Sequence, residues 1–534
     1  MFRTHLSVLE SSAARFSSSP VFKVPLMDAQ TNRLSDWTSI TYRQFYEDVL
    51  RFAAFWAKEL RRNDIPQRSV IGLWIGGFTY VDVLHIYGLS RAGYIPQLFS
   101  LRLPNPEVVF ELLVKANAKA LIFDDTYSDI VQNCHVPIYP AMKGAEEVDA
   151  GSEPVPDLPV VTEHDISFIF HTSGSTSGSP KLVPCNYRWL DTTVSKSSQI
   201  SMPRDPARQD VTTWMGSMCH IGQEFMLIGS MQHGSCVIQP TTISFSSEEL
   251  MDMIQTCGLN RLNQFAAFLA TQLQTSRNHP KLLSMLVNLD EVIYSGMPLP
   301  RPEQEWALQN NIKLRNLFGS TECGATLISI GGTGSDATLL RPLEGVDYRF
   351  VPVDSEESEA GHQSTARLLE FIVSSESGDC PDRSLCGSNS HFRTGDLFQE
   401  VTPGRYVFRG RNDDWIKSEN SLRCDTKAIE DNVRAMCGDL ISQCIVVGTG
   451  RPSPVLFIEP AGDMDHEKLK KDIIRKTRHF HSRRYLHERI SSAKMIVVVA
   501  RNTLPRTSTK GNIRRKAVEE TFQSRLDEIY GVSR

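Results

Sequence analysis

Hydrophobic positions along the first half of the chain alternate between a helical and a strand-like periodicity. Large apolar residues recur at helical spacing from Tyr42 to Leu60, which predicts an amphipathic helix. Short apolar runs predict strands at Ser69–Trp74, Ala120–Phe123 and Ile166–Phe170, and a helical run around Val83–Leu89 follows the first of them. Because strands that alternate with helices require parallel crossover connections, this half is predicted to be an α/β domain.

The second half of the chain has a different pattern. Asp354–Asn389 is rich in Ser, Glu and Gly and is predicted to form loops over a β-rich region. Aliphatic strands return at Cys444–Val447, Val455–Ile458 and Met495–Val499, and a strongly charged helix, Asp465–Ile490, lies between the last two. This helix could bind a phosphate-rich partner, but its interspersed acidic residues favour a solvated face. The pattern predicts a compact α+β terminal domain.

Composition narrows the class of protein. The 534 residues are 40% hydrophobic and 22% charged, enough for a large buried core and for two to four domains at roughly 100–200 residues each. The net charge of −5 argues against a dedicated nucleic-acid binder, which needs a dense basic surface. No apolar run approaches the roughly 20 residues that span a bilayer. We therefore expect a cytoplasmic globular protein with no nucleic-acid partner and no membrane span.

The cysteines and the first residues suggest no special chemistry. None of the eleven cysteines forms a C-x₂-C or C-x₄-C pair, so we expect mostly buried, reduced thiols rather than a zinc or redox site. The first twenty residues contain Arg3, Arg15 and several serines, as transit peptides do. Because Glu10 interrupts them, a first helix followed by a polar connection is the favoured interpretation.

One segment after a predicted strand has the composition of a phosphate-binding loop. It reads His-Thr-Ser-Gly-Ser-Thr-Ser-Gly-Ser-Pro-Lys over 171–181. Its small residues let backbone N–H groups approach a phosphate, its hydroxyls add donors, and its lysine adds positive charge. The spacing differs from a Walker A loop, since the G-x-x-x-x-G-K-[ST] pattern is absent. A Ser/Gly-rich loop alone is more often a flexible linker, but the strand before it and the Pro-Lys ending favour phosphate binding.

Four further motifs follow in order. They read Asn-Leu-Phe-Gly-Ser-Thr-Glu at 316–322, Phe-Arg-Thr-Gly-Asp at 392–396, Gly-Arg-Asn-Asp-Asp-Trp-Ile-Lys at 410–417 and Leu-Pro-Arg-Thr-Ser-Thr-Lys-Gly at 504–511. With the loop at 171–181 they resemble the adenylate-forming superfamily, which contains acyl-CoA synthetases, luciferases and the adenylation domains of nonribosomal peptide synthetases. All five motifs occur in the family's order, and the resemblance covers nearly the whole chain.

The resemblance implies a fold and a reaction in two steps. The fold would be a large N-terminal domain of α/β layers with a β-rich subdomain, residues 1–410, and a small mobile α+β C-terminal domain, residues 411–534. A carboxylate attacks the α-phosphate of ATP to give an acyl-adenylate and pyrophosphate, with Mg²⁺ as the metal. A thiol, on coenzyme A or on a carrier-protein phosphopantetheine, then displaces AMP. Such catalysis rests mostly on positioning and electrostatics.

The resemblance also assigns roles to residues within the motifs. In the phosphate loop it implies nucleotide contacts from Thr172, Ser173, Gly174, Ser175, Thr176, Gly178 and Lys181. In the second motif it implies nucleotide contacts from Asn316, Phe318, Gly319 and Ser320.

The reacting groups come from several of these motifs. Thr321 would contact the α-phosphate and Glu322 would hold Mg²⁺, a hard cation that prefers oxygen ligands. Asp396 would accept hydrogen bonds from the ribose hydroxyls, and Arg411 would assist at the ribose or phosphate. Lys510 would reach between the substrate carboxylate and the α-phosphate.

Asp413 matches the hinge position of the family. There the small domain swings relative to the large one, which removes the Lys510 equivalent after adenylation and admits the thiol. Hinges absorb backbone change at a few residues between domains. The composition shifts at this point of the chain, so we place the domain boundary there.

Three departures from the family pattern stand out. The phosphate loop has one residue more than the usual T-S-G-S-T-G-x-P-K, and in the last motif Lys510 precedes Gly511 instead of following a glycine. Asn420 stands where a glycine is usual, and Asn tolerates positive φ better than most residues. These variants look most like stand-alone relatives of fungal synthetase-like adenylation domains, which suggests secondary metabolism.

The expected substrate is a carboxylic acid without an α-amino group. The segment 215–222 resembles the family motif beside the acyl pocket, where amino-acid-activating members carry an Asp that pairs with the ammonium. The matching position here is His220, and Glu224 is the nearest acid. An unpaired ammonium in a pocket would be costly. His220 could instead be a hydrogen-bonded structural histidine.

The acceptor and two other classes of function stay open at this point. Only 24 residues follow Lys510, too few for a carrier or reductase domain, so we expect coenzyme A or a separate carrier protein to act in trans. The competing interpretations are an inactive AMP-binding relative that acts as a binding or scaffold protein, and a luciferase-type monooxygenase.

Overall fold

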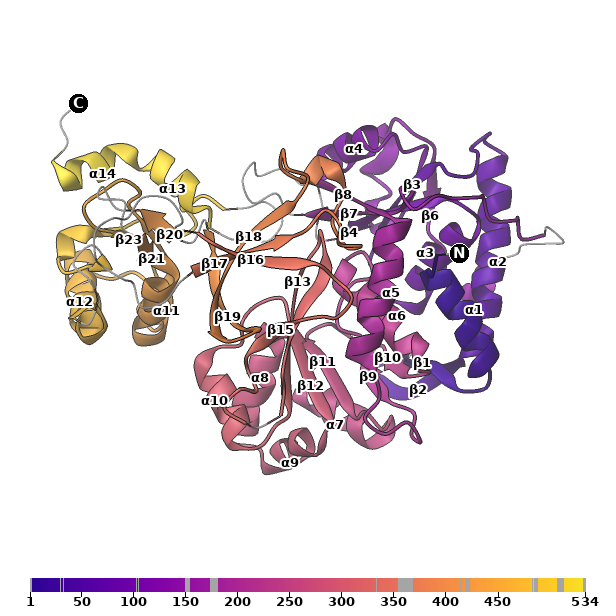
Figure 1. Cartoon of the computed structure of the whole chain (residues 1–534), viewed down its shortest axis with the longest axis horizontal. Coiled ribbons are helices and arrows are strands. Elements are labelled where there is room, and N and C mark those ends of the chain that lie inside the picture. Colours follow the sequence, from indigo (N-terminus) through magenta and orange to yellow (C-terminus); the bar gives the residue numbers. More distant parts are fainter. Residues whose placement is uncertain are drawn as a thin grey trace.

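The computed structural model describes most of the chain. The described residues are 2–531, with gaps at 29, 32, 102, 104, 149–153, 173–180, 333, 354–367, 413–414, 418–422, 483, 485–487 and 507–512. Two large sheets and their helices make up the N-terminal part, and a smaller body of helices and strands follows it (Figure 1).

The first sheet has six strands and is parallel apart from one edge. Its spatial order is β6 (Ile138–Pro140), β5 (Ala120–Phe123), β3 (Val70–Ile75), β4 (Ile95–Ser100), β7 (Ile166–Thr172) and β8 (Lys181–Asn186). The last two strands form an antiparallel hairpin, in which Thr172 pairs with Lys181. The phosphate-loop sequence is therefore the connection of this hairpin.

The second sheet has thirteen strands and changes character along its width. One half runs β2 (Leu34–Thr41), β1 (Pro20–Met27), β10 (Cys236–Ile238), β9 (Val211–Thr213), β11 (Arg261–Phe265), β12 (Glu291–Ser295) and β13 (Leu314–Ser320). The other half runs β14 (Gly324–Ser329), β15 (Leu340–Pro342), β19 (Arg405–Arg411), β18 (Phe392–Thr402), β17 (Leu368–Val373) and β16 (Tyr348–Pro352). Pairing is parallel from β1 to β13 and antiparallel from there on. This second half is the expected β-rich subdomain.

Helices cover both sheets. The first group is α1 (His5–Arg15), α2 (Tyr42–Arg61), α3 (Tyr80–Arg91), α4 (Pro106–Lys115), α5 (Tyr187–Ser201) and α6 (Ile221–Gln232). The second group, α7 (Ser247–Thr256), α8 (Ala266–Ser276), α9 (Pro280–Asn288) and α10 (Arg301–Gln309), gathers beside β11 and β12 (Figure 1). The largest core cluster contains side chains from α1, α2, α3, α5 and α6, so these helices share one interior.

The C-terminal body has its own core. It consists of the hairpin β20 (Trp415–Lys417) and β21 (Arg423–Asp425), the sheet β22 (Ile441–Val447), β23 (Val455–Pro460) and β24 (Ile496–Val498), and the helices α11 (Thr426–Cys437), α12 (His466–Ser482), α13 (Arg515–Thr521) and α14 (Gln523–Tyr530). Its two hydrophobic clusters draw on residues from 416 onward. The expected fold class is confirmed, whereas the boundary at 410–411 and the mobility of the small domain stay predictions.

The predicted elements agree with the structure except in two places. Asp354–Asn389 was expected to be loops, but Leu368–Val373 forms strand β17, because its apolar run pairs with both β16 and β18. The charged helix ends at Ser482 rather than Ile490, because its buried positions recur every four residues only as far as His481. The first helix is α1, which buries Val8 and Leu9.

The cysteines and the helix lengths agree with the expectations from composition. All eleven cysteines are free, and eight of them are buried. Among the described helices none is both long and apolar enough to cross a membrane.

Candidate active site

Two motifs of the large domain lie at one edge of the second sheet. Strands β9, β11, β12 and β13 are parallel, so their carboxyl ends lie at the same edge. The segment 215–222 follows β9, and the segment 316–322 begins in β13 and runs past its end. In open α/β sheets ligands bind in the crevice outside the carboxyl ends of the strands. The topology therefore brings together two motifs that are about a hundred residues apart in the sequence.

Phe265, at the end of β11, lies against the segment that follows β9 and against the residue that follows β12. A β-carbon at Gly216 would lie 3.0 Å from the Phe265 ring, and one at Gly296, just past β12, would lie 3.2 Å from it. Both glycines therefore let the backbone approach this ring closely. Sequence reasoning missed Phe265, because the strand that it ends, β11, reads Arg-Leu-Asn-Gln-Phe and has no apolar run that would predict a strand.

The hairpin of β13 and β14 presents Thr321 and Glu322 at its turn. Gly319 is required here by packing, since a β-carbon would clash with the carbonyl of Gly324 and lie 2.8 Å from Cα of Ala325. Gly324 has a φ of +65°, a conformation that side chains disfavour. The Phe318 ring packs 5.2 Å from that of Phe398 in the β-rich subdomain. The two glycines thus shape the turn that the sequence assigned to nucleotide binding.

Glu322 has the environment that a magnesium ligand needs. Its side chain is partly exposed, and among the described residues its carboxylate has no hydrogen-bond donor or cation. The described residues contain no cluster of three or more His, Cys, Asp or Glu side chains that could hold a metal by themselves. Mg²⁺ commonly uses one or two carboxylates and completes its shell with phosphate oxygens and water. The residues present fit this arrangement.

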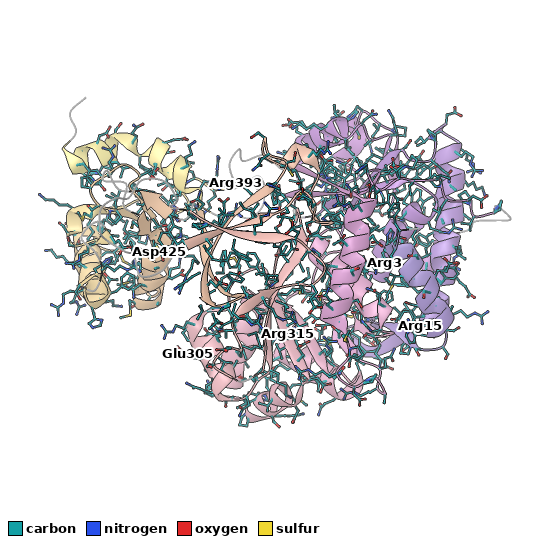
Figure 2. All side chains as sticks on the ribbon, in the orientation of Figure 1. Arg3, Arg15, Glu305, Arg315, Arg393 and Asp425 are labelled. Carbon is teal, nitrogen blue, oxygen red and sulfur yellow. The ribbon has the colours of Figure 1, made fainter. Side chains whose placement is uncertain are left out.

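Helix α5 connects the phosphate-loop hairpin to this turn. It starts directly after β8, with Asn186 as its N-cap. The Trp189 indole N–H donates to the backbone carbonyl of Glu322 at 3.1 Å, and Lys196 Nζ donates to the carbonyl of Cys323 at 2.7 Å. Arg3, labelled over this helix in Figure 2, donates to Asp191 on its outer side. One helix therefore joins the two segments that the sequence assigned to nucleotide binding.

Asp396 and Arg411 face each other across the hairpin of β18 and β19. They are register partners, and Arg411 Nη1 donates to Asp396 Oδ1 at 3.2 Å. The Asp396 side chain is only 8% exposed, whereas that of Arg411 is 45% exposed. Thr394 Oγ1 accepts from the Asp396 backbone N–H at 3.0 Å, which fixes the strand at this point. A held carboxylate next to an exposed guanidinium suits a ribose and a phosphate.

His220 and Glu224 differ in accessibility. His220 is the N-cap of α6, is exposed, and accepts from the Gly222 N–H at Nδ1. Glu224 is buried one turn further on, where the Tyr87 hydroxyl donates to Oε1 at 3.1 Å. Burial raises the pKa of Glu224 to about 8, so this acid is neutral at pH 7. It does not offer a carboxylate to a substrate ammonium.

The remaining predicted site residues are divided between the described and undescribed parts of the chain. Ser173, Gly174, Ser175, Thr176, Gly178, Asp413 and Lys510 lie outside the described residues. Thr172 and Lys181 close the base of the phosphate-loop hairpin, and Asn316 and Ser320 lie in β13.

The chain on either side of Lys510 is well fixed. Arg506 and Ile513 form an isolated antiparallel bridge, and Arg506 Nη2 donates to buried Glu459 at 2.6 Å. The Leu504 N–H donates to the other oxygen of Glu459 at 3.0 Å. Leu504 and Arg506, the described start of the last motif with Pro505, are therefore anchored to β23 of the small domain.

Comparison with known proteins identifies the family to which this chain belongs. Residues 9–363 match the AMP-binding enzyme family and residues 413–533 match the AMP-binding enzyme C-terminal domain. The chain is 35% identical over 517 residues to the AMP-binding domain-containing enzyme iboA of Amanita muscaria (strain Koide BX008), with 94% of this chain and 98% of that protein covered. The chain belongs to the family of AMP-binding, adenylate-forming enzymes.

Two further comparisons show how the family varies. The adenylate-forming reductase Nps11 of Serpula lacrymans is 22% identical over 98% of this chain, which spans 49% of that longer protein. The o-succinylbenzoate CoA synthetase of Bacillus subtilis, solved with its acyl-adenylate intermediate, has the same fold, with a TM-score of 0.73 at 14% identity over 97% of this chain and 98% of that one. The same synthetase has also been solved with ATP and magnesium.

Proposed function

We propose that this protein activates a carboxylic acid with ATP and then transfers the acyl group to a thiol. In the first step a carboxylate oxygen attacks the α-phosphorus, the bond to the β-phosphate oxygen breaks, and pyrophosphate leaves. In the second step the thiol sulfur attacks the acyl carbon, its proton is lost, and AMP leaves with the electron pair of the broken C–O bond. The acceptor is coenzyme A or a carrier-bound phosphopantetheine.

One observation carries the proposal: a single helix, α5, joins the phosphate-loop hairpin to the turn with Thr321 and Glu322. This geometry supports roles for the loop at the β- and γ-phosphates, for Thr321 at the α-phosphate and for Glu322 at Mg²⁺, which would neutralise charge on the phosphates. Asp396 and Arg411 would orient the ribose. Lys510, from the small domain, would bring positive charge to the reacting oxygens, and Asp413 would be the hinge that removes it.

The surroundings of segment 215–222 support an acid without an α-amino group. Glu224, the nearest acid to His220, is neutral and hydrogen-bonded to Tyr87. A substrate ammonium would therefore lack a counter-charge from this helix, at considerable cost. The o-succinylbenzoate synthetase, which shares the fold, is named for an aryl acid. Aryl and fatty acids are accordingly the first candidates.

ATP–pyrophosphate exchange with Mg²⁺, run over aryl, fatty, dicarboxylic and amino acids, tests the proposal. Exchange with one acid class is expected, and Asp396→Asn should raise the KM for ATP about tenfold or more, because a ribose hydrogen bond to a charged group is lost. Glu400→Gln, on the exposed end of the same strand, is the matched control. Silence from folded protein across the panel contradicts the proposal and favours a binding protein, and oxygen uptake with ATP and acid would indicate a monooxygenase.

A further inference from the structure

A fully buried ion pair lies directly behind the turn that carries Thr321 and Glu322. Lys196 of α5 and Asp379 are both 0% exposed, and Lys196 Nζ lies 2.6 Å from Asp379 Oδ2. The backbone carbonyl of Cys323 also accepts a hydrogen bond from Lys196 Nζ, at 2.7 Å. The cation thus joins three segments: a helix, the site turn, and the loop that leads to β18 and Asp396.

The loop with Asp379 is fitted closely to α5. Arg188 donates to the carbonyl of Glu376, and a β-carbon at Gly378 would clash with the hydroxyl of Thr192. Arg188, Thr192 and Lys196 are spaced four residues apart, so they form one stripe along the helix. Asp379 is further held by Ser377 Oγ at 2.5 Å and by the Tyr348 hydroxyl.

A second side chain of α5 also donates to a backbone carbonyl of the turn. Trp189, seven residues before Lys196 and therefore on the same side of α5, holds the carbonyl of Glu322. Two consecutive carbonyls of the turn are thus hydrogen-bonded by side chains of one helix. A hydrophobic pair of similar volume would often be as stable as a buried ion pair, so stability alone does not account for Lys196 and Asp379. What an apolar pair could not supply is a donor for the Cys323 carbonyl.

We infer that Lys196, held by Asp379, is a positioning residue that sets the Thr321–Glu322 turn relative to the phosphate-loop hairpin; this rests on the proposed function. It touches no substrate. It acts through the backbone of Cys323, so it determines where the Glu322 carboxylate stands with respect to the phosphates. Loss of this contact should weaken the use of Mg²⁺ and lower turnover more than it weakens ATP binding.

The variants separate position from stability. Lys196→Met leaves Asp379 charged, buried and unpaired, and is expected to destabilise the protein strongly. The double variant Lys196→Met/Asp379→Asn removes both charges, so it should regain most of the lost Tm but still lack the donor to Cys323. Trp189→Phe removes only the indole donor to Glu322 and keeps the ring. Arg261→Met is the matched control, since Arg261 is also a buried, paired cation and lies outside the site.

The experiment measures the Tm of each variant. Pyrophosphate exchange then gives the KM for ATP, the Mg²⁺ concentration for half-maximal rate, and kcat per folded molecule. The double variant should lose about ten- to a hundredfold in kcat and need several-fold more Mg²⁺, with a smaller change in KM. Trp189→Phe should show the same pattern more weakly, and Arg261→Met should keep kcat and Mg²⁺ use within about twofold. Recovery of kcat together with Tm in the double variant would overturn the inference.

A separate readout distinguishes failure of this inference from failure of the proposed function. If wild-type protein exchanges no pyrophosphate, ATP is titrated calorimetrically with and without Mg²⁺. The readout is the Kd for ATP without Mg²⁺ divided by the Kd with Mg²⁺. A fall of this ratio in the double variant and in Trp189→Phe, but not in Arg261→Met, supports the positioning role without any turnover. The positioning role is contradicted if this ratio is unchanged in both the double variant and Trp189→Phe, or if Mg²⁺ has no effect on ATP binding in wild type.

Discussion

Two buried cations are associated with α5, one at the end of the helix and one within it, and they have different roles. Arg261, at the start of β11, donates to the carbonyls of Ile200, Ser201 and Met202 at the end of α5 and pairs with Asp210 and Glu291. Lys196, in the body of the helix, has one carboxylate partner and the Cys323 carbonyl. The first cation satisfies a helix terminus at the strand end away from the site, and the second contacts the site turn.

The difference teaches that burial of a charge has no single meaning. A cation at the C-terminus of a helix complements unpaired carbonyls and the helix dipole, so the Arg261 cluster stabilises the fold. Arg315, labelled in Figure 2, adds a second guanidinium to Glu291 at 3.0 Å. The Lys196 pair forms fewer contacts, but it links α5, the site turn and the loop that contains Asp379.

The largest expected effect is on stability, from Arg261→Met. The variant leaves Asp210 and Glu291 buried with less compensation, which should cost about 3–5 kcal/mol of unfolding free energy. Denaturant unfolding measures this loss, and exchange activity per folded molecule should stay near that of wild type. A large fall in kcat would mean that the two ion-pair clusters do not differ in role.

Gly319→Ala tests the contact between β13 and β14 that shapes the site turn. The added methyl would clash with the Gly324 carbonyl, so the hairpin of β13 and β14 must open. The expected cost is about 1–3 kcal/mol, as for other overpacked sites, with a fall in kcat because Glu322 shifts. Gly258→Ala is a useful contrast: its space is open, so any loss there reflects only its φ of +74°. Equal activity in both variants would show that the turn tolerates movement.

Glu224 extends the comparison to a buried acidic group that has no cation partner among the described residues. Its pKa, raised by burial to about 8 from 4.5, means that the folded state holds a proton that the unfolded state has lost. Stability should therefore fall as pH rises toward 8, by up to about 1.4 kcal/mol per pH unit.

The pH range for this test avoids the neighbouring histidine. Burial lowers the pKa of His5, whose ring packs on Tyr87, to about 3, so above pH 6.5 it is mostly neutral in both states. Denaturant unfolding from pH 6.5 to 8 should show the slope in wild type and a flatter profile in Glu224→Gln. Glu305→Gln, at an exposed position labelled in Figure 2, should leave the slope unchanged. Identical slopes in all three proteins would show that Glu224 is ionised in the fold.

The smallest effect is expected from the exposed ion pair between Arg3 and Asp191 of α5. Arg3 and Asp191 lie 2.8 Å apart with side chains 55% and 33% exposed. Asp191→Asn should cost no more than about 1 kcal/mol and should leave kcat unchanged, since water screens the pair. A thermal melt at low and high salt checks both points, and a loss as large as that of Arg261→Met would contradict the distinction between exposed and buried pairs on α5.

The sequence by itself determined the class of this protein. Five motifs, each a run of neighbouring residues, identified the family, and periodicity placed α2, β5 and the strands of the small domain within a few residues. This worked because nucleotide contacts come from short loops and because amphipathic elements show their own period. Strand β17 was missed because the polar residues around it dominated the composition of its segment.

Only the tertiary structure decided how the motifs are held. Lys196 is 127 residues from Cys323 and 183 from Asp379, and no local pattern marks any of the three. The raised pKa of Glu224 likewise comes from its burial in the folded protein rather than from its neighbours in sequence. Groups that contact a ligand follow local spacing, whereas groups that position them depend on which distant segments the fold brings together.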